Sequence, residues 1–483
     1  MPARKVKLVG QATELEGTVI ADKYRTSHPY IPNTAPEVYQ KMLEDIGVQD
    51  VEELFKGIPD SLRFKGKMNI PEALSEYELR RHVESLLEQN TSCKENISFL
   101  GAGCWPHFIP AVCDEINQRA EFLSAYAGEP YEDHGRFQAL FEYQSLVAEL
   151  VDMDVVNVPT FDWAQAAATS LRMACRITGR AQVLLSGTID PEKYQIIKNY
   201  CSPEISCTLI NYDAATGQLD LEDLKAKISG KTAAVYFENP SFLGLIEEHG
   251  QAISWMTHQF DAVCVVGVDP ITLGVLEPPS RYGADIVCGE LQPLGMHMNY
   301  GGGQAGFIAT RDELKFVQEY PSRLFGIAPT VAAGEYGFGD VFYERTSFHD
   351  RINGKEAVGT QTALWGITAG VYLALLGPQG MHQLGKTILQ KSQYAMRQLA
   401  KIKGVVASRF SSVSFKEFVV DFNRTGKTVQ EINQYLLSNH IFGGKDLSHS
   451  FPELGQCALY CVTEIHSRDD IDQLITALQS FFK

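Results

Sequence analysis

Residues 287–303 read VCGELQPLGMHMNYGGG, which is an apolar run, a short polar segment and then a loop rich in glycine. An apolar strand that ends in a flexible loop is a common way for an α/β protein to hold a cofactor, because ligands gather at the carboxyl ends of such strands. The stretch contains no lysine. The pattern therefore predicts a cofactor-type fold, and the missing amine raises the question of what this fold depends on.

The run AVCVVGVD, residues 262–269, places Asp269 at the end of another apolar strand. In the commonest fold of pyridoxal phosphate enzymes, an aspartate at such a strand end pairs with the pyridinium nitrogen, and the Schiff-base lysine follows roughly two dozen residues later. Here position 292, 23 residues on, is glutamine, and no lysine occurs between Lys231 and Lys315. These 83 consecutive residues therefore offer no amine to a cofactor held near Asp269, and we expect no covalent cofactor. The alternative is that Asp269 only caps its strand and that no cofactor fold exists.

A helix start is expected in FDWAQAAATSLRMACR, residues 161–176, where an aspartate precedes an alanine-rich segment. Asp162 would cap this helix, and the free N–H groups of its first turn could hold a phosphate. Such a cup needs small or hydroxyl residues, whereas Trp163 occupies the position here. The indole either fills the space of the phosphate or stacks on a flat partner, or it simply packs in the core or at an interface.

The alternation of strands and helices predicts the fold class. From about residue 96, helical stretches separate the apolar segments QVLLSG, SCTLINY, TAAVYFENP, AVCVVGVD, ADIVCGE and QAGFIAT. This order indicates an α/β fold with a mostly parallel sheet covered on both faces. Further on, helix candidates alternate with the strands VVASRF, EFVVDF and ALYCVTE. We expect a large α/β domain at residues 96–364 and a smaller C-terminal α+β domain at 365–483.

Residues 29–95 have a helical character. PEVYQKMLEDIGVQDVEELF and PEALSEYELRRHVESLLEQN each place apolar residues three and four apart, as on one face of a helix. Both begin with proline, which suits the first turn of a helix. Because these segments have no strands of their own, we expect a helical N-terminal arm that packs onto the rest. Residues 1–28 form an N-terminal extension of unassigned role.

The composition excludes several functional classes. The formal charge of −17 disfavours non-specific binding to nucleic acid or anionic lipid, because the summed field repels phosphate. No apolar run approaches the length of a membrane span, and the basic start soon becomes acidic, so we expect neither a membrane anchor nor a targeting peptide and place the protein in the cytoplasm. The ten cysteines lack CxxC or metal-type spacing, so buried thiols are expected rather than disulfides or metal ligands.

Several long segments, in order, resemble the characteristic text of one family: HPYIPNTAPEVYQKMLEDIGV, IPEALSEYELRRHV, SFLGAGCWPHFIPAV, FQALFEYQSLVAELVDMDVVN, LGVLEPPSRYGADIVCGELQPLG and VYLALLGPQGM. On these segments the chain is similar to the alpha subunit, or subunit 1, of glycine dehydrogenase (decarboxylating). This is the P-protein of the glycine cleavage system in its split, two-gene form. The resemblance runs from about residue 29 to the C-terminus and implies fold type I of pyridoxal phosphate-dependent transferases.

The resemblance also implies a cofactor and partners. Alpha and beta subunits of this family associate as α2β2, with the lysine and pyridoxal phosphate in the beta subunit, so no activity is expected from the alpha subunit alone. The implied reaction is decarboxylation of glycine, with transfer of the aminomethyl group to a lipoyl carrier protein. By this resemblance Gln292 stands at the lysine position. A vestigial cofactor site would then comprise Asp162, Trp163, Asn239, Asp269 and Gln292.

The chain departs from the family pattern where function is expected. AYAGEPYEDHG, residues 125–135, is one residue shorter than the usual text and lacks its Thr-Pro-Tyr-Gln pattern. In ERTSFHDRINGKEAVGTQTAL, Arg345 and Arg351 keep their places, but Asn353 and Ala357 replace an expected lysine and asparagine. Three interpretations remain open: relaxed constraint on a lysine-free subunit of glycine cleavage, an alpha subunit of a paralogous complex acting on another small amine or amino acid, or a non-catalytic scaffold subunit.

The residue types also suggest candidates for a site shared with the beta subunit. His107 matches a histidine of the family and could orient a carboxylate or shuttle a proton, or it could equally be satisfied by a backbone carbonyl. The tip of the altered loop could be an interface lid or a solvated turn. His297, with no partner in sequence, is weak evidence for a ligand. The candidates at a shared interface are therefore His107, Glu129, Tyr131, His134, Arg345 and Arg351.

Overall fold

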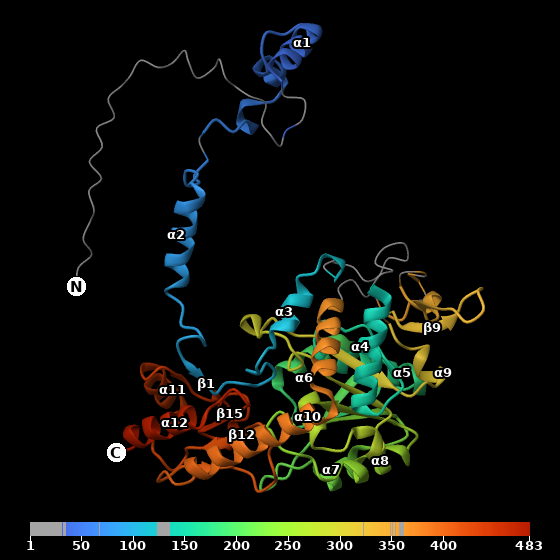
Figure 1. The fold of residues 1–483 in the computed structure, drawn as a ribbon, viewed down its shortest axis with the longest axis vertical. Coiled ribbons are helices and arrows are strands. Elements are labelled where there is room, and N and C mark those ends of the chain that lie inside the picture. The colour runs from blue at the N-terminus through green and yellow to red at the C-terminus, as the bar shows by residue number, and fades with distance from the viewer. Residues whose placement is uncertain are drawn as a thin grey trace. The chain divides into compact units, whose positions relative to one another are not determined.

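The computed structural model describes residues 31, 35–66, 68–122, 136–321, 323–347, 349, 351–352, 354–356 and 362–483. The chain divides into two units, one up to Gln89 and one from Asn90 onward. Figure 1 shows the elements of each unit.

The described residues of the N-terminal unit form two helices, α1 (Pro36–Ile46) and α2 (Glu76–Leu87), and two 3-10 turns, Val51–Gly57 and Asp60–Leu62. α1 begins at Pro36 as expected and ends where Gly47 adopts a φ of 81°. The expectation that the second helix begins at Pro71 is wrong. Ser75 caps α2 instead, because its hydroxyl accepts the N–H of Glu78 while the Glu78 carboxylate accepts the N–H of Ser75.

Apolar side chains of the N-terminal unit are mostly exposed. Among its described residues only Leu43 of α1 is buried, whereas Met42, Leu62 and Phe64 are more than half exposed. Short helices gain most of their stability from packing of an apolar face. The described part of this unit therefore has no core of its own.

The second unit is built on a seven-stranded mixed sheet with the order β2-β8-β7-β6-β5-β3-β4. Each of the six strand segments predicted from the sequence contains one of its strands, so the predicted α/β class is confirmed. Strands β3 to β7 run parallel to one another. The strands are β2 (Val155–Val156), β3 (Gln182–Ser186), β4 (Ser206–Ile210), β5 (Thr232–Glu238), β6 (Val263–Val268), β7 (Ile286–Glu290) and β8 (Gly306–Thr310).

One edge of the sheet is antiparallel. β8 runs against both β7 and β2. The segment between β7 and β8 is the polar and glycine-rich stretch of residues 291–305, and its only helical element is the 3-10 turn Asn299–Gly301. A parallel return needs a crossover, usually a helix, so this connection forms a local reversal instead.

Helices cover both faces of the sheet, as the near-continuous apolar strands predict. In β6 the side chains of Val263 and Val265 join one buried cluster with α5, while Cys264, Val266 and Val268 join another with α4 and α10. The period of two sends alternate side chains to opposite faces. The helices are α4 (Phe137–Val151), α5 (Trp163–Thr178), α6 (Pro191–Cys201), α7 (Leu221–Lys227), α8 (Gly250–His258), α9 (Leu314–Val317) and α10 (Ala363–Leu399).

α10 leads from the sheet into the C-terminal layer, residues 400–483 (Figure 1). It bends where Gly377 adopts a φ of 59° before Pro378, because proline cannot continue the helical hydrogen bonds. The layer packs α11 (Val429–Ser438) and α12 (Arg468–Phe481) on the antiparallel sheet β11-β12-β15-β14. Its strands are β11 (Val406–Ala407), β12 (Glu417–Asp421), β14 (Lys445–Asp446) and β15 (Cys457–Cys461).

The remaining elements are short. β1 (Ile97–Ser98) pairs with β13 (Ile441–Phe442), and β9 (Phe325–Pro329) forms a hairpin with β10 (Tyr336–Asp340). α3 (Ala111–Asn117) lies between β1 and α4 along the chain. Seven of the ten cysteines are buried. Among the described residues, no helix combines the length and the apolar character that a membrane crossing requires.

Candidate functional site

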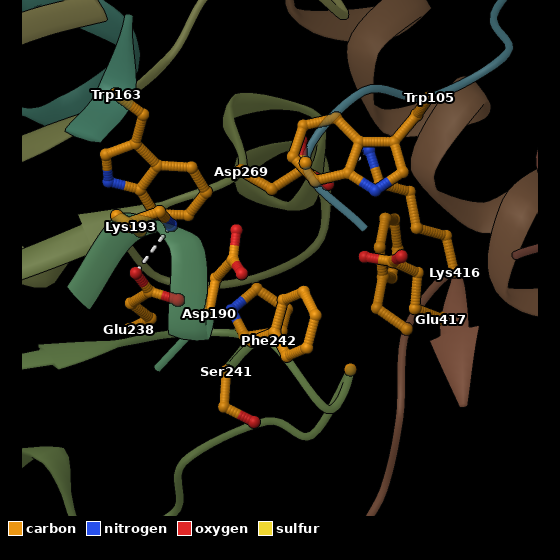
Figure 2. Close-up of a pocket in the computed structure, with 14 residues that line it drawn as sticks. Trp105, Trp163, Asp190, Lys193, Glu238, Ser241, Phe242, Asp269, Lys416 and Glu417 are labelled. Carbon is orange, nitrogen blue, oxygen red and sulfur yellow. Dashed lines mark hydrogen bonds and ion pairs between the residues drawn. The ribbon is translucent and has the colours of Figure 1, made fainter. Parts of the chain in front are cut away.

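A small cavity lies at the carboxyl ends of β5 and β6, and Figure 2 shows the side chains around it. Its volume is about 30 Å³, which is room for two or three water molecules. Its lining comes from loops and helices around the seven-stranded sheet and from the C-terminal layer. The aromatic and charged side chains of this lining include Trp105, Trp163, Lys193, Glu238, Asp269 and Lys416.

Asp269 follows β6 and caps the 3-10 turn Pro270–Gly274. Its Oδ1 accepts the backbone N–H of Ile271 at 3.1 Å. Its Oδ2 lies 2.7 Å from Nζ of Lys416, which immediately precedes β12 in the C-terminal layer. The lysine-free stretch around Asp269 is therefore not the whole of its surroundings, because the fold brings in a lysine from far along the chain.

Lys416 is enclosed by the loop before α3. Its Nζ lies 3.6 Å from the centroid of the Trp105 ring, and Figure 2 shows the indole beside the lysine. The same Nζ lies 3.2 Å from Nε2 of His107. Nδ1 of His107 lies 2.8 Å from Oε2 of Glu464, which is in the C-terminal layer. One lysine thus joins the sheet, the loop before α3 and the C-terminal layer through buried polar contacts.

α5 begins beside the cavity, and the prediction that Asp162 caps it is confirmed. Oδ1 of Asp162 accepts the N–H of Gln165 at 2.7 Å. The N–H of Trp163 donates to Oε2 of Glu290 at 3.2 Å, and the N–H of Ala166 donates to the carbonyl of Asp162 at 3.0 Å. N–H groups of the first turn that could have held a phosphate are therefore bonded to carboxylates of this chain.

The side chain of Trp163 is buried against a charged pair. Only 6% of its surface is exposed, and Nζ of Lys193 in α6 lies 3.3 Å from the ring centroid. Lys193 forms an ion pair with Oε1 of Glu238 at 2.6 Å, and the hydroxyl of Tyr236 donates to the same oxygen at 2.8 Å. The indole is therefore a packed wall of the cavity with a cation on its face (Figure 2).

Gln292 follows β7 and is completely buried. Its Oε1 accepts the backbone N–H of Trp105 at 3.0 Å, and its Nε2 donates to the carbonyl oxygens of Trp105 and Met296 at 3.1 and 3.0 Å. Gln292 is not among the described residues that line the cavity. The side chain at the expected lysine position thus fastens the loop that carries Trp105.

The carboxyl groups near the cavity are in a water-poor environment. Burial raises their pKa values above the ordinary range, to about 8 for Glu290, although the N–H groups of Ala305, Gln292 and Trp163 act in the opposite direction on Glu290. Further negative charge is disfavoured in such a place. The other carboxyl groups with a raised pKa are Asp162, Asp190, Glu238 and Glu417.

Residues 28–478 match the family model of the glycine cleavage system P-protein, which is nearly the whole chain. The chain belongs to the glycine cleavage system P-protein family. Among curated P-protein relatives, a probable glycine dehydrogenase (decarboxylating) subunit 1 of Staphylothermus marinus is 40% identical over 94% of this chain and 98% of that protein. Proteins with the same name from Thermococcus onnurineus and Desulforamulus reducens are 38% and 39% identical, over 93% of this chain and 98% and 99% of their own lengths.

Solved structures agree with the family. A crystal structure of glycine decarboxylase (P-protein) in inhibitor-bound form superposes with a TM-score of 0.80 at 30% identity. The match covers 94% of this chain and 100% of the chain in that crystal structure. A sphingosine-1-phosphate lyase from Burkholderia pseudomallei shares the fold, with a TM-score of 0.63 at 12% identity over 88% and 94% of the two chains. The fold is therefore type I of the pyridoxal phosphate-dependent enzymes, as the resemblance implied.

The structure brings together only part of the expected vestigial site. Trp163 and Asp269 line the cavity, whereas Asp162, Gln292 and Asn239 are not among the described lining residues. Asn239 accepts the N–H of Glu247 at 3.0 Å and donates to the Glu247 carbonyl at 3.3 Å. It shapes its own loop, one of the two roles considered for it.

The interface candidates have different outcomes. The side chain of His107 has no exposed surface and contacts Glu464 and Lys416 inside this chain, and its place in a shared site stays a prediction. Arg345 is also buried and donates to the carbonyl of Tyr320. Arg351 is exposed. Glu129, Tyr131 and His134 lie outside the described residues, as do Asn353 and Ala357.

His297, which the sequence left without a partner, does have one in the fold. Its Nε2 lies 2.9 Å from Oδ1 of Asp114 in α3, and both side chains are about half exposed. A half-exposed pair of this kind needs no ligand to explain it. His297 therefore serves as a surface contact between the loop after β7 and α3.

The residues around the cavity do not fit pyridoxal phosphate. Asp269, the expected partner of the ring nitrogen, is already paired with Lys416, and N–H groups of the phosphate cup are bonded to Asp162 and Glu290. The lysine position holds Gln292, with its amide fully engaged.

Sequence reasoning missed Lys193, Glu238, Lys416 and Glu417. One signal was present: SFKEFVVDF, residues 414–422, places a lysine and a glutamate directly against an apolar strand. Charged side chains in such a position are rarely buried without a partner. The identity of that partner, Asp269, could not be found by inspecting neighbours in sequence.

Proposed function

We propose that this chain is subunit 1 of a two-subunit glycine dehydrogenase (decarboxylating), and that it completes the active site of a lysine-bearing subunit 2. The similarity to proteins of that name, 40% over nearly the full length of both chains, supports the assignment. The observation that supports these different roles of the two subunits is the ion pair between Asp269 and Lys416. An aspartate paired with Lys416 and an amide at position 292 leave this chain without the groups that hold a catalytic pyridoxal phosphate.

In this proposal the chemistry belongs to the partner. Subunit 2 holds the pyridoxal phosphate, which supplies an electron sink for loss of carbon dioxide from glycine, and a lipoyl carrier protein accepts the aminomethyl group. The contribution of this chain is positioning. Its Lys416 and Gln292 contact the loop before α3, and a loop held by such contacts can shape a neighbouring pocket and keep water out.

The surface that meets the partner stays a prediction. We infer that the altered loop, with Glu129, Tyr131 and His134, and the exposed Arg351 contribute to it. These residue types support the inference because they differ from the family text or offer charge for an anionic substrate or carrier. His107 and Arg345 are better explained as internal contacts of this chain.

The test is reconstitution with a lysine-bearing subunit 2, pyridoxal phosphate and a lipoyl carrier. We expect release of labelled carbon dioxide from carboxyl-labelled glycine by the mixture and none by this chain alone. Parallel assays with other small amino acids separate glycine cleavage from a paralogous complex. If subunit 2 turns over glycine equally well without this chain, the chain is a scaffold and the proposal fails.

A further inference from the structure

The cavity carries the wrong charge for an anionic cofactor. Among the described residues that line it are four carboxyl groups, of Asp190, Glu238, Asp269 and Glu417, but only two amines, of Lys193 and Lys416. Each amine is already within 2.7 Å of a carboxylate oxygen, with Lys193 on Glu238 and Lys416 on Asp269. A phosphate dianion entering this space would meet surplus negative charge where opposite charge is needed.

One end of the cavity reproduces the contact of a cofactor ring. In fold type I the strand-end aspartate receives a positively charged ring nitrogen. Here Oδ2 of Asp269 receives the ammonium of Lys416 at 2.7 Å instead. The flat surface next to that charge is the indole of Trp105, 3.6 Å from Nζ. A cation and an aromatic plane therefore stand beside Asp269, and both belong to this chain (Figure 2).

The other end is filled in a related way. The first turn of α5 would offer its N–H groups to a phosphate, yet the N–H of Trp163 donates to Glu290 at 3.2 Å. The carboxyl group of Glu290 thus stands where an anion would bind. The Trp163 indole and the Lys193 ammonium occupy the adjoining space, with Nζ 3.3 Å from the ring centroid.

The same side chains connect the two layers of the second unit. Lys416 and Glu417 belong to the C-terminal layer, and Glu417 accepts the N–H of Ala102 in the loop before α3. Only 3% of the Lys416 side chain and 6% of the Asp269 side chain are exposed. A buried charge that is separated from its partner is strongly destabilising. Buried ion pairs of this kind therefore favour the one arrangement of their elements in which both partners meet.

We propose that this chain's own side chains have taken the place of the cofactor: Lys416 with Trp105 at the ring position and Trp163 with Lys193 and Glu290 at the phosphate position. They hold the C-terminal layer on the sheet without any bound ligand. This inference stands whichever amino acid the assembly uses, because it concerns only contacts inside this chain.

The first test uses pyridoxal phosphate itself as the probe on the full chain. We expect no saturable binding in equilibrium dialysis, no change in the midpoint of thermal unfolding, and no borohydride-fixed adduct on Lys193 or Lys416 in peptide mass spectra. In a complex with a lysine-bearing partner, we expect one cofactor for each pair of chains, bound to the partner. One saturable cofactor on this chain, or an adduct on either lysine, overturns the proposal even if the glycine assay succeeds.

The second test asks whether these side chains, besides occupying the place of the cofactor, also hold the C-terminal layer on the sheet. Lys416→Met leaves Asp269 buried without its cation, and we expect the unfolding midpoint to fall on the order of 5 °C, with faster hydrogen exchange in β12 and β15. Lys416→Met combined with Asp269→Asn should recover part of the loss. Lys427→Met, which removes an exposed lysine 3.5 Å from Glu431, is the matched control.

Two outcomes of the second test decide the matter. A fall for Lys416→Met no larger than for the Lys427→Met control overturns the holding role. If Lys416→Met yields no folded protein, Asp269→Asn alone gives the same comparison, because it keeps the side-chain volume and leaves Lys416 its contact with His107. An Asp269→Asn variant as stable as wild type, with unchanged exchange in β12, would equally overturn it.

Discussion

Gln292 and Trp105 are joined by two hydrogen bonds, although 187 residues separate them in sequence. The Trp105 N–H donates to Oε1 of Gln292 at 3.0 Å, and Nε2 of Gln292 donates to the Trp105 carbonyl at 3.1 Å. An amide can satisfy a backbone N–H and a backbone C=O at once, whereas an ammonium can only donate. The residue at the lysine position is therefore suited to holding a backbone rather than to reacting with an aldehyde.

Gln292→Lys is predicted to destabilise the chain without restoring cofactor binding. The change leaves the buried N–H of Trp105 without its acceptor and buries an amine, so we expect a loss of about 3 kcal/mol in the free energy of unfolding, measured in urea. No adduct with pyridoxal phosphate should be fixed by borohydride. Gln292→Met, which loses the same bonds but adds no charge, is the control and should cost less. A stable Gln292→Lys protein that captures the cofactor would contradict the prediction.

Lys193→Met is predicted to cost about 3 kcal/mol of unfolding free energy, because it leaves Glu238 buried without its cation. The double variant with Glu238→Gln should recover part of this loss. Lys315→Met removes a pair of similar length, 2.8 Å from Glu313, but both side chains are more than half exposed, so its cost should stay below about 1 kcal/mol. Equal losses for Lys193→Met and Lys315→Met would show that burial of the first pair has no energetic effect.

Glu464 gives a predicted dependence of stability on acid pH. Burial alone would raise its pKa, but the charge and hydrogen bond of His107 and the N–H of Phe108 lower it from 4.5 to about 2. A depressed pKa stabilises the folded state above pH 4.5, and this contribution disappears as the pH falls from 4.5 to 2. It amounts to at most about 3 kcal/mol. Urea unfolding at successive pH values should show Glu464→Gln less stable than wild type at pH 7, with the two converging in acid. A constant difference at all pH values would rule this out.

Gly244→Ala is predicted to loosen the contact between the loop after β5 and the C-terminal layer. Gly244 has a φ of 84°, and a Cβ atom there would overlap the backbone carbonyl of Glu417. We expect a loss of about 4 kcal/mol, from left-handed strain and the clash together, seen as a lower unfolding midpoint. Gly426→Ala isolates the strain, since Gly426 has a φ of 73° and a Cβ added there would have no atom within 4 Å, and it should cost about 1–2 kcal/mol. Equal effects of the two changes would argue against the close approach.

Local patterns in the sequence predicted much of the fold. The apolar runs gave the positions of β3 to β8, and Asp162 was correctly identified as a helix cap, because strand periodicity and capping depend on a few adjacent residues. The start of α2 was misplaced for a local reason as well. The Ser75–Glu78 capping box satisfies two N–H groups, whereas Pro71 only suits a first turn.

The candidate site was predicted less completely. Asp269 and Trp163 were correctly placed at one end of the sheet, but their partners Lys416 and Lys193 were not found. At position 292 the sequence showed only that a lysine is missing, whereas the structure shows that Gln292 binds the loop of Trp105. Such pairings depend on which elements pack together, and no window of sequence contains both partners.

The sequence by itself determined the α/β alternation, the family and the absence of a lysine from residues 232–314. Only the tertiary structure decided what surrounds Asp269. Folding returns β12 to the carboxyl end of β6, so that Lys416 supplies the charge that local sequence lacks. The physical reason is that a buried carboxylate needs a cation close in space, and distance along the chain places no limit on where that cation comes from.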